Sequence, residues 1–291
     1  MELHVYKYQG AGNDFVIIDN RKGNIELTTE QVRWLCDRRF GIGSDGLMLL
    51  DKADGYDFSM RYFNSDGPEG TMCGNGGRCL VAFADHCGIK NFKFIAIDGV
   101  HEANILKREG FRKIVKLKMI DIKGFEPYSE SAYFLNTGSP HYVEFVGRVA
   151  DYPVAERGYF WRHHKDFKGG TNVNFVEFGG YGTEETALSG TMVPLYNNEI
   201  SVRTFERGVE AETYACGTGI TASALCTFMR FNRPQMLKQG KSVAVLHCNV
   251  KALGDRLSVD AVWNEQEKIF TDVWLTGPAT LVFETNVELP L

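Results

Sequence analysis

The sequence is short of several features that define large classes of protein. Its apolar runs, such as FVII at 15–18 and LMLL at 47–50, have the length of core strands. They fall well below the roughly 18 residues that a membrane helix needs. Charge of neither sign dominates, with 37 Asp and Glu against 32 Lys and Arg, so no nucleic-acid or anionic-membrane partner is indicated. The hydrophobic content of 44% excludes a disordered chain.

Cysteine is also sparse, with seven in 291 residues. A disulfide scaffold uses far more, and an odd number cannot all pair within one chain. The start, MELHVYKYQGAGNDF, carries charges at Glu2, Lys7 and Asp14 and lacks the apolar core of a signal peptide or anchor. No cofactor motif is found. We therefore expect a cytoplasmic protein with reduced thiols, of a length that favours two similar domains.

Short strand-like segments outnumber helical ones. Alternation or β-rich composition predicts strands over 2–8, 15–19, 57–63, 92–97, 100–106, 112–120, 131–136, 141–146, 172–178, 199–205, 243–249, 256–263 and 269–275. Capping and stop signals predict helices over 29–39, 75–87, 153–165 and 218–231. Thr28 and Gln31 have capping-box spacing at the first helix, and Pro234 is expected to end the last one.

One basic run, KREGFRKIVKLK at 107–118, invites a polyanion-binding interpretation. Its Lys113, Lys116 and Lys118 alternate with apolar residues, as on the solvent face of a strand. We therefore interpret it as a strand and not as a binding surface.

The informative feature is a pair of similar segments, MCGNGGRC at 72–79 and ACGTGITA at 215–222. Each has the pattern Cys-Gly-x-Gly and precedes a helical pattern rich in small residues. The cysteines, Cys73 and Cys216, lie 143 positions apart, about half the chain. This spacing predicts a doubled architecture in which each half supplies one cysteine at one helix N-terminus.

A helix N-terminus suits a reactive cysteine. Its unpaired N–H groups and the positive end of the dipole favour a thiolate or a bound carboxylate. The dipole is worth about 0.3–1 kcal/mol, up to about 2 when partly buried, so it shifts a thiol pKa by roughly one unit. Two such thiols on opposite sides of one carbon could remove a proton and return another, which inverts the centre.

Several motifs then carry a family resemblance across nearly the whole chain. They are GAGNDF at 10–15, GIGSDG at 41–46, FNSDG at 63–67, MCGNG at 72–76, ERG at 206–208 and ACGTG at 215–219. In this order they resemble diaminopimelate epimerase. The resemblance implies interconversion of LL- and meso-2,6-diaminopimelate in lysine and peptidoglycan precursor biosynthesis. It also implies that the reaction needs no pyridoxal phosphate, no other cofactor and no metal.

The resemblance also implies an α+β fold of two pseudo-symmetric domains, each a mixed barrel-like sheet wrapped around a central helix, with the site in the cleft between them. We expect one domain over 1–122 plus 276–291, carrying Cys73, and the other over 123–275, carrying Cys216. A cytoplasmic homodimer with a small amino-acid substrate is expected, without nucleic-acid or membrane partners.

Individual site residues follow from the same resemblance. Cys73 and Cys216 fall on the catalytic pair, and His141 and Glu206 on residues that assist the thiols. Substrate binding is implied for Asn13, Asn64, Gly74, Asn75, Ser139, Asn172, Glu206, Arg207, Gly217 and Thr218. A planar Arg side chain suits a carboxylate. Each residue also has a plain structural interpretation: Asn13, Asn64 and Asn172 stand where a turn favours Asn, and His141 could be a satisfied buried histidine.

This chain departs from the family pattern at three points. Ser139 stands where Asn usually precedes Pro-His, so a shorter side chain or water must make one substrate contact. Gly46 stands where some members have Gln. The loop at 208–213 is one residue longer than usual. The other cysteines, Cys36, Cys79, Cys87, Cys226 and Cys248, fit apolar patterns, and their spacing matches no usual zinc site.

Other functions remain open. A racemase or epimerase of the same fold could act on proline, hydroxyproline or histidine, although the proline enzymes usually have His where Asn75 stands. A non-catalytic carboxylate-binding protein would not need two cysteines in register. A dithiol redox protein would favour a close CxxC pair.

Overall fold

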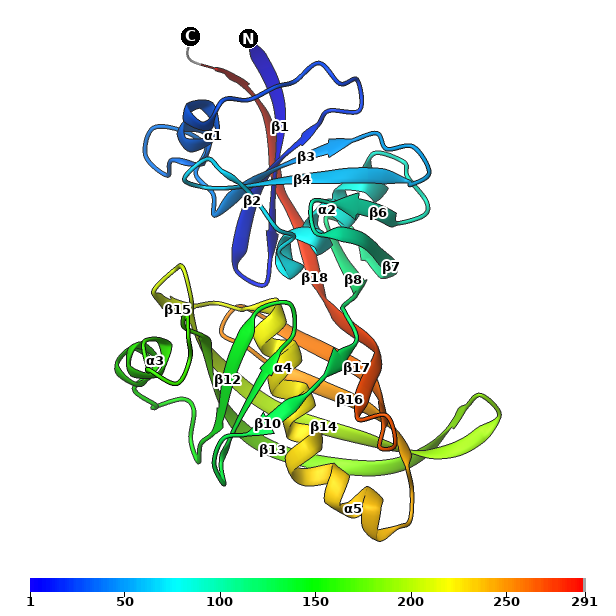
Figure 1. Ribbon diagram of the computed structural model, residues 1–291. Coiled ribbons are helices and arrows are strands. Elements are labelled where there is room, and N and C mark those ends of the chain that lie inside the picture. Colours follow the sequence, from blue (N-terminus) through cyan, green and yellow to red (C-terminus); the bar gives the residue numbers. More distant parts are fainter. Residues whose placement is uncertain (290–291) are drawn as a thin grey trace. The chain divides into compact units, whose positions relative to one another are not determined.

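The computed structural model describes residues 1–289. The chain forms two compact units. The first comprises residues 1–117 and the segment that begins at Gly277, and the second comprises residues 118–276. The last strand, β18 (Ile269–Glu288), is shared, because it leaves the second unit and enters the first at Gly277. It is the long red strand in Figure 1.

The strands of the first unit close into a ring. Their hydrogen-bonding order is β1, β2, β3, β4, β6, β7, β8 and the end of β18, which pairs with β1 again. The pairs β2–β3 and β4–β6 are parallel, and the other pairs are antiparallel. The bounds are β1 (Glu2–Gly10), β2 (Asn13–Asp19), β3 (Gly46–Asp51), β4 (Phe58–Asn64), β6 (Lys93–Ala96), β7 (Gly99–Glu109) and β8 (Arg112–Lys118). A short β5 (Glu69–Gly70) pairs with β4.

Two helices cover the two faces of this sheet. Helix α2 (Gly74–His86) packs on β1, β2, β3 and β7, and all its residues from Gly74 to Ala84 are buried, so the ring encloses it (Figure 1). Helix α1 (Thr29–Cys36) packs outside, on a core that includes Val16, Ile18, Leu47 and Leu49. The predicted capping box is confirmed, because Thr28 and Gln31 exchange side-chain to backbone hydrogen bonds.

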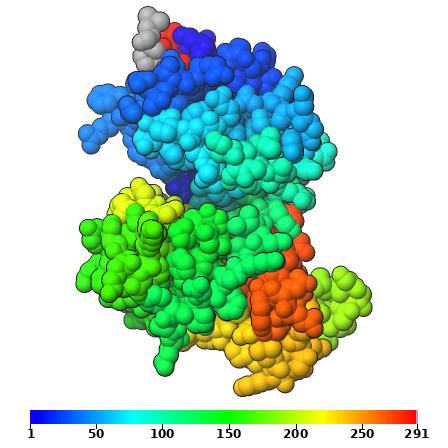
Figure 2. Space-filling view, viewed as in Figure 1, coloured from blue at the N-terminus to red at the C-terminus, as the bar shows by residue number. Residues whose placement is uncertain are grey.

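The second unit has an equivalent ring. Its order is β11, β12, β13, β14, β16, β17, the start of β18 and β9. Gly124 alone separates β9 from β10, and β10 pairs with β11. The bounds are β9 (Ile122–Lys123), β10 (Phe125–Pro127), β11 (Ala132–Asn136), β12 (Pro140–Phe145), β13 (Asn172–Leu188), β14 (Thr191–Glu206), β15 (Ala211–Thr213), β16 (Val243–Lys251) and β17 (Arg256–Asn264). The exposed tip of the β13–β14 hairpin projects from the body of its unit (Figure 2).

Helix α4 (Gly217–Thr227) lies within this second ring, against β11, β12, β13, β14, β16 and β17. A helix buried on all sides must be apolar or satisfy its polar groups internally. The hydroxyls of Thr221, Ser223 and Thr227 do so by donating to the carbonyls four residues earlier, at 2.7–3.0 Å. Helix α3 (Val154–Arg162) packs outside the ring, on a core that includes Phe175 and Phe205.

The two units repeat one order of elements. In each, a helix joins the first parallel strand pair (β2–β3 or β12–β13), and an enclosed helix precedes the second strand of the other parallel pair (β4–β6 or β14–β16). The predicted α+β class, with two related barrel-like sheets around central helices, is confirmed.

Several local predictions failed. The strands predicted over 172–178, 199–205 and 269–275 are much longer, because β13 extends to Leu188, β14 begins at Thr191 and β18 extends to Glu288. Two further failures have a clear physical reason. Strand β3 was not predicted as a strand, because both of its faces are buried and it shows no alternation. The helical path also does not stop before Pro234: a π-helical turn (Phe228–Asn232) leads into α5 (Arg233–Lys238), which has this proline in its first turn. The π-helical turn changes the hydrogen-bond spacing just before the proline, since Arg233 donates five residues back to Phe228, and the helix continues past Pro234.

Candidate active site

Cys73 is the N-cap residue of α2. Its backbone is extended, with φ −88° and ψ 130°, and its side chain makes no capping hydrogen bond. Its carbonyl accepts the N–H of Gly77 at 2.7 Å, which starts the helix. The thiol therefore lies at the positive end of the dipole of α2, beside the backbone of Gly74.

Two amide side chains join the start of α2 to the start of β2. Asn75 donates to Asn13 Oδ1, and Arg78 donates to Asn75 Oδ1 at 2.7 Å. Asn13 Nδ2 donates to Asp45 at 3.0 Å. Both Asn75 and Arg78 are fully buried, at 1% and 0% exposure. Each amide has one orientation that satisfies these partners, so the structure brings the predicted residues Asn13 and Asn75 together.

An ionic cluster adjoins Asn13. Asp14 contacts Lys7 at 2.7 Å and Arg38 at 2.6 Å, and Arg38 also contacts Asp45 at 2.7 Å. Burial acts to raise the pKa of Asp14, but the hydrogen bonds from Arg38 and Lys7 outweigh it and hold that pKa below its usual value. The site of the first unit is thus backed by paired charges.

Asn64 ends β4, opposite Gly46 of β3. Its N–H donates to the carbonyl of Pro68 and its carbonyl accepts from Gly67, both at 2.9 Å, and its side chain is exposed. The structure therefore gives this residue a turn role, and its exposed amide remains open to a ligand.

Cys216 is the N-cap residue of α4, in the place that Cys73 holds in α2. Its φ is −103° and its ψ is 112°, and the residue is 7% exposed. Its carbonyl accepts the N–H of Ile220 at 2.8 Å. Its Sγ lies 3.4 Å from the hydroxyl of Thr218. Gly217 and Thr218 follow directly in the first turn of α4.

Ser139 and Asn172 lie beside this helix end. The Ser139 hydroxyl lies 3.2 Å from that of Thr218 and accepts from Asn172 Nδ2 at 3.3 Å. Asn172 also donates to the carbonyl of Pro140 at 3.0 Å, and its Oδ1 accepts the N–H of Arg207 at 2.9 Å. The structure brings four predicted ligands of the second unit into one hydrogen-bonded group.

His141 belongs to the same group and is fully buried. Its Nε2 lies 3.0 Å from the Ser139 hydroxyl, and its Nδ1 lies 3.1 Å from Asn174 Nδ2. Burial, reinforced by the charge of Arg207, lowers the pKa of His141 to about 3. The imidazole is therefore neutral at physiological pH.

Sequence reasoning missed Asn174. It lies two residues after Asn172 on β13, so both side chains leave the same face of the strand. Asn174 is 0% exposed, and its Oδ1 accepts from Thr204 at 3.0 Å. The period of two along a strand, applied from Asn172, was the signal that could have found it.

Glu206 ends β14, and Arg207 follows it. Glu206 accepts a hydrogen bond from Thr213 at 3.0 Å and is partly exposed. The Arg207 side chain is exposed, while its backbone N–H holds Asn172. Both charges are thus placed at the same end of the unit as Cys216.

The remaining cysteines have different surroundings. Cys36, Cys79, Cys226 and Cys248 are buried in the core, and burial raises the pKa of each thiol. Cys87, the C-cap of α2, is half-buried, and burial raises its pKa to about 11. These five thiols stay protonated at neutral pH and suit packing roles.

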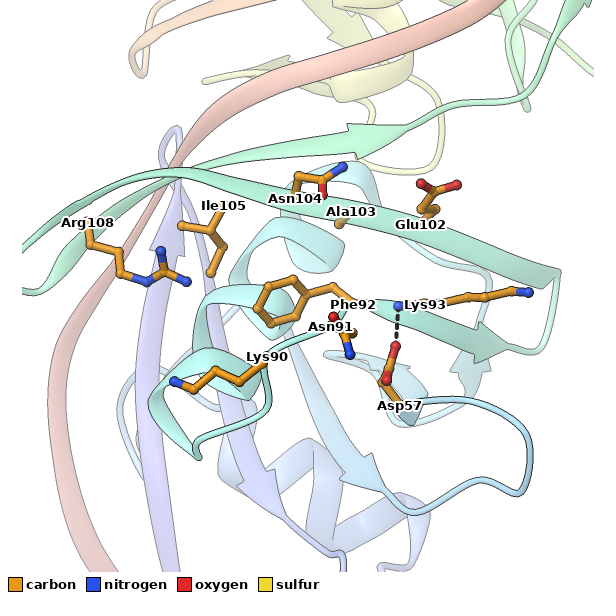
Figure 3. Close-up of a pocket in the computed structure, with 10 residues that line it drawn as sticks. All are labelled: Asp57, Lys90, Asn91, Phe92, Lys93, Glu102, Ala103, Asn104, Ile105 and Arg108. Atoms are coloured by element: carbon orange, nitrogen blue, oxygen red, sulfur yellow. Dashed lines mark hydrogen bonds between the residues drawn. The ribbon is translucent and has the colours of Figure 1, made fainter.

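A surface pocket of about 510 Å³ in the first unit holds none of the predicted site residues (Figure 3). It is lined by residues of the α2–β6 connection, β6 and β7, and the carboxylate of Asp57 accepts the N–H of Lys93 there at 2.8 Å. The Arg108 guanidinium on its rim is held by Asp85 at 2.8 Å. Neither of the cysteines that cap the enclosed helices lines this pocket.

Within residues 1–289, no group of three or more His, Cys, Asp or Glu side chains is arranged to hold a metal ion. Among the helices of that same part of the chain, none has the length and apolar character to cross a membrane.

Comparison with solved structures defines the class of fold. The chain matches a phenazine biosynthesis protein of the PhzF family from Bacillus anthracis with a TM-score of 0.70 at 16% identity, over 99% of this chain and 100% of that one. It also matches a probable proline racemase from Agrobacterium radiobacter with a TM-score of 0.58 at 14% identity, over 99% and 93% of the two chains. These likenesses show a shared two-barrel fold.

Sequence comparison then identifies the family. The sequence model of diaminopimelate epimerase matches residues 5–115. A diaminopimelate epimerase from Flavobacterium psychrophilum is 41% identical over 98% of this chain and 100% of its own length. One from Chlorobaculum tepidum is 41% identical over 96% and 99%. The chain belongs to the diaminopimelate epimerase family, and it is therefore an isomerase of the amino-acid epimerase class, which needs neither pyridoxal phosphate nor a metal.

Proposed function

We propose that this protein interconverts LL- and meso-2,6-diaminopimelate, and so serves the synthesis of lysine and of peptidoglycan precursors. Relatives of nearly equal length carry this activity in their names. The observation that carries the proposal is the repetition of one device: each unit encloses one helix, and each enclosed helix has a cysteine as its N-cap.

In the proposed mechanism, the Cys73 and Cys216 side chains work on opposite faces of the Cα carbon. One thiolate removes the Cα proton while the other thiol delivers a proton from the opposite side, and the roles exchange with the direction of reaction. Backbone N–H groups of the two first turns, at Gly74–Asn75 and Gly217–Thr218, hold the carboxylate and stabilise the charge that develops next to Cα.

The proposal assigns the other site residues as follows. His141 and Glu206 assist the thiols, and the two zwitterionic ends of the substrate are bound by Asn13, Asn64, Ser139, Asn172, Glu206 and Arg207. Hydrogen bonds already hold the amides of Asn13 and Asn172 in one orientation, which lowers the entropic cost of binding. Arg207 presents a planar donor suited to a carboxylate.

We further propose that the enzyme works without a cofactor, in the cytoplasm and as a homodimer. The domains expected over 1–122 plus 276–291 and over 123–275 have bounds within a few residues of the two compact units, which divide at 117/118 and 276/277. Support for this part comes from the family resemblance, and size-exclusion chromatography with light scattering tests the dimer directly.

Single thiol replacements test the mechanism. In Cys73→Ser and Cys216→Ser we expect epimerisation of LL-diaminopimelate to fall by about 10³-fold or more, since a hydroxyl is a far weaker base than a thiolate. The rate of epimerisation is measured as exchange of the Cα proton in deuterated water. Cys87→Ser, at the other end of α2, is the matched control and should retain activity. Near-normal turnover in either active-site variant would sink the two-base mechanism.

A substrate panel tests the assignment against its competitors. Diaminopimelate should exchange its Cα proton, whereas proline, hydroxyproline and histidine should exchange little or not at all. The probable proline racemase shares the fold, and Ser139 replaces the Asn usual in the family, so this panel is needed. Comparable exchange on proline or histidine would transfer the assignment to a racemase of that amino acid.

A further inference from the structure

The hydrogen bonds behind Cys216 have a single direction, and Asn174 sets it. Asn174 Nδ2 lies 3.1 Å from the carbonyl of Tyr142, and its Oδ1 accepts from Thr204 at 3.0 Å. A carbonyl can only accept, so the nitrogen of this amide must face Tyr142. The same nitrogen lies 3.1 Å from His141 Nδ1, which therefore accepts.

The tautomer of His141 follows. A neutral imidazole carries one proton, and its Nδ1 is occupied as an acceptor, so the proton is on Nε2. This N–H points at the Ser139 hydroxyl 3.0 Å away and donates to it. The ring is fully buried and faces the charge of Arg207, which keeps it neutral.

Ser139 continues the same direction of hydrogen-bond donation toward Thr218. Its oxygen accepts from His141 and also from Asn172 Nδ2, whose orientation is fixed by the carbonyl of Pro140 and the N–H of Arg207. With both lone pairs used, its own proton goes to Thr218, 3.2 Å away.

Thr218 closes the series. Its hydroxyl accepts from Ser139 and lies 3.4 Å from the Cys216 Sγ, to which it can donate its own proton when the sulfur is a thiolate. Each donor in the series is itself a hydrogen-bond acceptor, which polarises it and strengthens the next bond. A hydrogen bond donated to sulfur favours the thiolate over the thiol.

We propose that Asn174, His141, Ser139 and Thr218 form a one-way donor chain that holds Cys216 in its thiolate form, with Asn174 as the positioning residue that fixes its direction. This inference rests on the proposed function, because it names Cys216 as the cysteine that is a thiolate before substrate binds and can therefore accept the Cα proton. It also assigns a purpose to Ser139, one of the three points at which the chain departs from its family.

The tautomer is tested in the unaltered protein. Histidine labelled with nitrogen-15 is read by long-range proton–nitrogen correlation, and the His141 signal is assigned by its loss in His141→Gln. We expect the proton on Nε2 and not on Nδ1. A proton on Nδ1, or on both nitrogens at neutral pH, would overturn the proposal. In Asn174→Asp a carboxylate replaces the donor, and the proton should move to Nδ1.

The effect on sulfur is tested by alkylation of the substrate-free enzyme with iodoacetamide across pH, with labelling of Cys216 and Cys73 quantified in the same sample by peptide mass spectrometry. In Thr218→Val the midpoint of Cys216 labelling should rise by about one pH unit, the size expected for loss of a hydrogen bond to a charged group. Thr218→Ser should keep the wild-type midpoint. Glu206, Arg207 and the dipole of α4 are present in all variants, so their influence cancels.

The Cys73 midpoint should shift less than that of Cys216, because the Thr218 hydroxyl lies 3.4 Å from Cys216 Sγ and belongs to the same helix turn. An unchanged Cys216 midpoint in Thr218→Val, or an equal shift at Cys73, would overturn the proposal. Failure of the proposed function looks different: the labelling shift would be present while diaminopimelate is not epimerised. If Thr218→Val does not fold, Ser139→Ala interrupts the same chain one step earlier and should shift Cys216 labelling in the same direction.

Discussion

The two enclosed helices begin alike, but what lies behind them differs. In the first unit, a Cβ placed on Gly76 would lie 3.3 Å from Met48 Sδ and 3.5 Å from Phe15. These neighbours are apolar. The polar groups near this helix end are the hydrogen-bonded side chains of Asn75, Asn13 and buried Arg78.

In the second unit, the equivalent Gly219 lies against Asn174 and His141. The strand registers show that these are the same positions: Phe15 pairs with Gly46 and Met48 follows two residues later, just as His141 pairs with Asn172 and Asn174 follows two residues later. One scaffold thus carries an apolar backing for one thiol, with charged Arg78 nearby, and a hydrogen-bonded backing of neutral side chains for the other. The comparison teaches that repetition of the backbone does not make the two cysteines equivalent.

Grafting the first surrounding onto the second unit should give the largest effect. In His141→Phe/Asn174→Met, we expect a fall in kcat of about 10–100-fold, since the donor chain to Cys216 is lost. Both new side chains are larger than the ones they replace, so circular dichroism must show that the variant is folded. KM should change less, because Asn172 and Arg207 remain. Steady-state kinetics with diaminopimelate measures both constants, and an unchanged kcat would show that the two surroundings are interchangeable.

A smaller effect, on the free energy of unfolding, should distinguish alanine substitutions at Gly219 and Gly76. Gly219→Ala places a methyl group against Asn174 Oδ1, closer than any contact at Gly76, and should lower the free energy of unfolding by about 1–3 kcal/mol through overpacking. In Gly76→Ala the nearest contact of the new methyl group is the thioether of Met48 at 3.3 Å, which yields more easily, so a change below about 1 kcal/mol is expected. Urea denaturation compares them, and equal losses would remove this distinction.

The smallest effect concerns stability against acid. The pKa of His141 is about 3 in the folded protein against 6.5 as its ordinary value. The unfolded chain therefore binds the proton over this interval and the folded one does not, so stability decreases as pH falls. The contribution should be about 1 kcal/mol between about pH 6.5 and about pH 5.5.

This contribution should be missing in His141→Gln and kept in Ser139→Ala, which retains the imidazole. Thermal or urea unfolding at several pH values shows it as a difference between variants. An identical pH slope in His141→Gln and wild type would contradict a neutral buried ring.

The repeated architecture and the position of both cysteines could be predicted because they depend on local signals. Gly-rich first turns, capping residues and alternation mark the elements, and the spacing of Cys73 and Cys216 marks the repeat. Strand β3 could not be predicted by alternation, because helices cover both of its faces. Pro234 was wrongly expected to end the helix, because proline is also common in the first turn of a helix, where it stands in α5.

The donor chain could not be predicted at all. Asn174 acquires its role from Tyr142 and Thr204, which reach it across β12 and β14. Ser139 was first interpreted only as a loss relative to the family Asn. Its link to Thr218 joins residues 79 positions apart in sequence. Such directions of donation depend on which atoms meet, and no periodicity encodes them.

The shared strand β18 also sets an order of events during synthesis. The ring of the first unit contains the first strand of the chain, yet it closes only through residues after Gly277. On the ribosome, every residue of the second unit is made before that closing segment. The unit that is started first is therefore completed last. Until then, the backbone groups of β1 and β8 that pair with the end of β18 have no strand beside them.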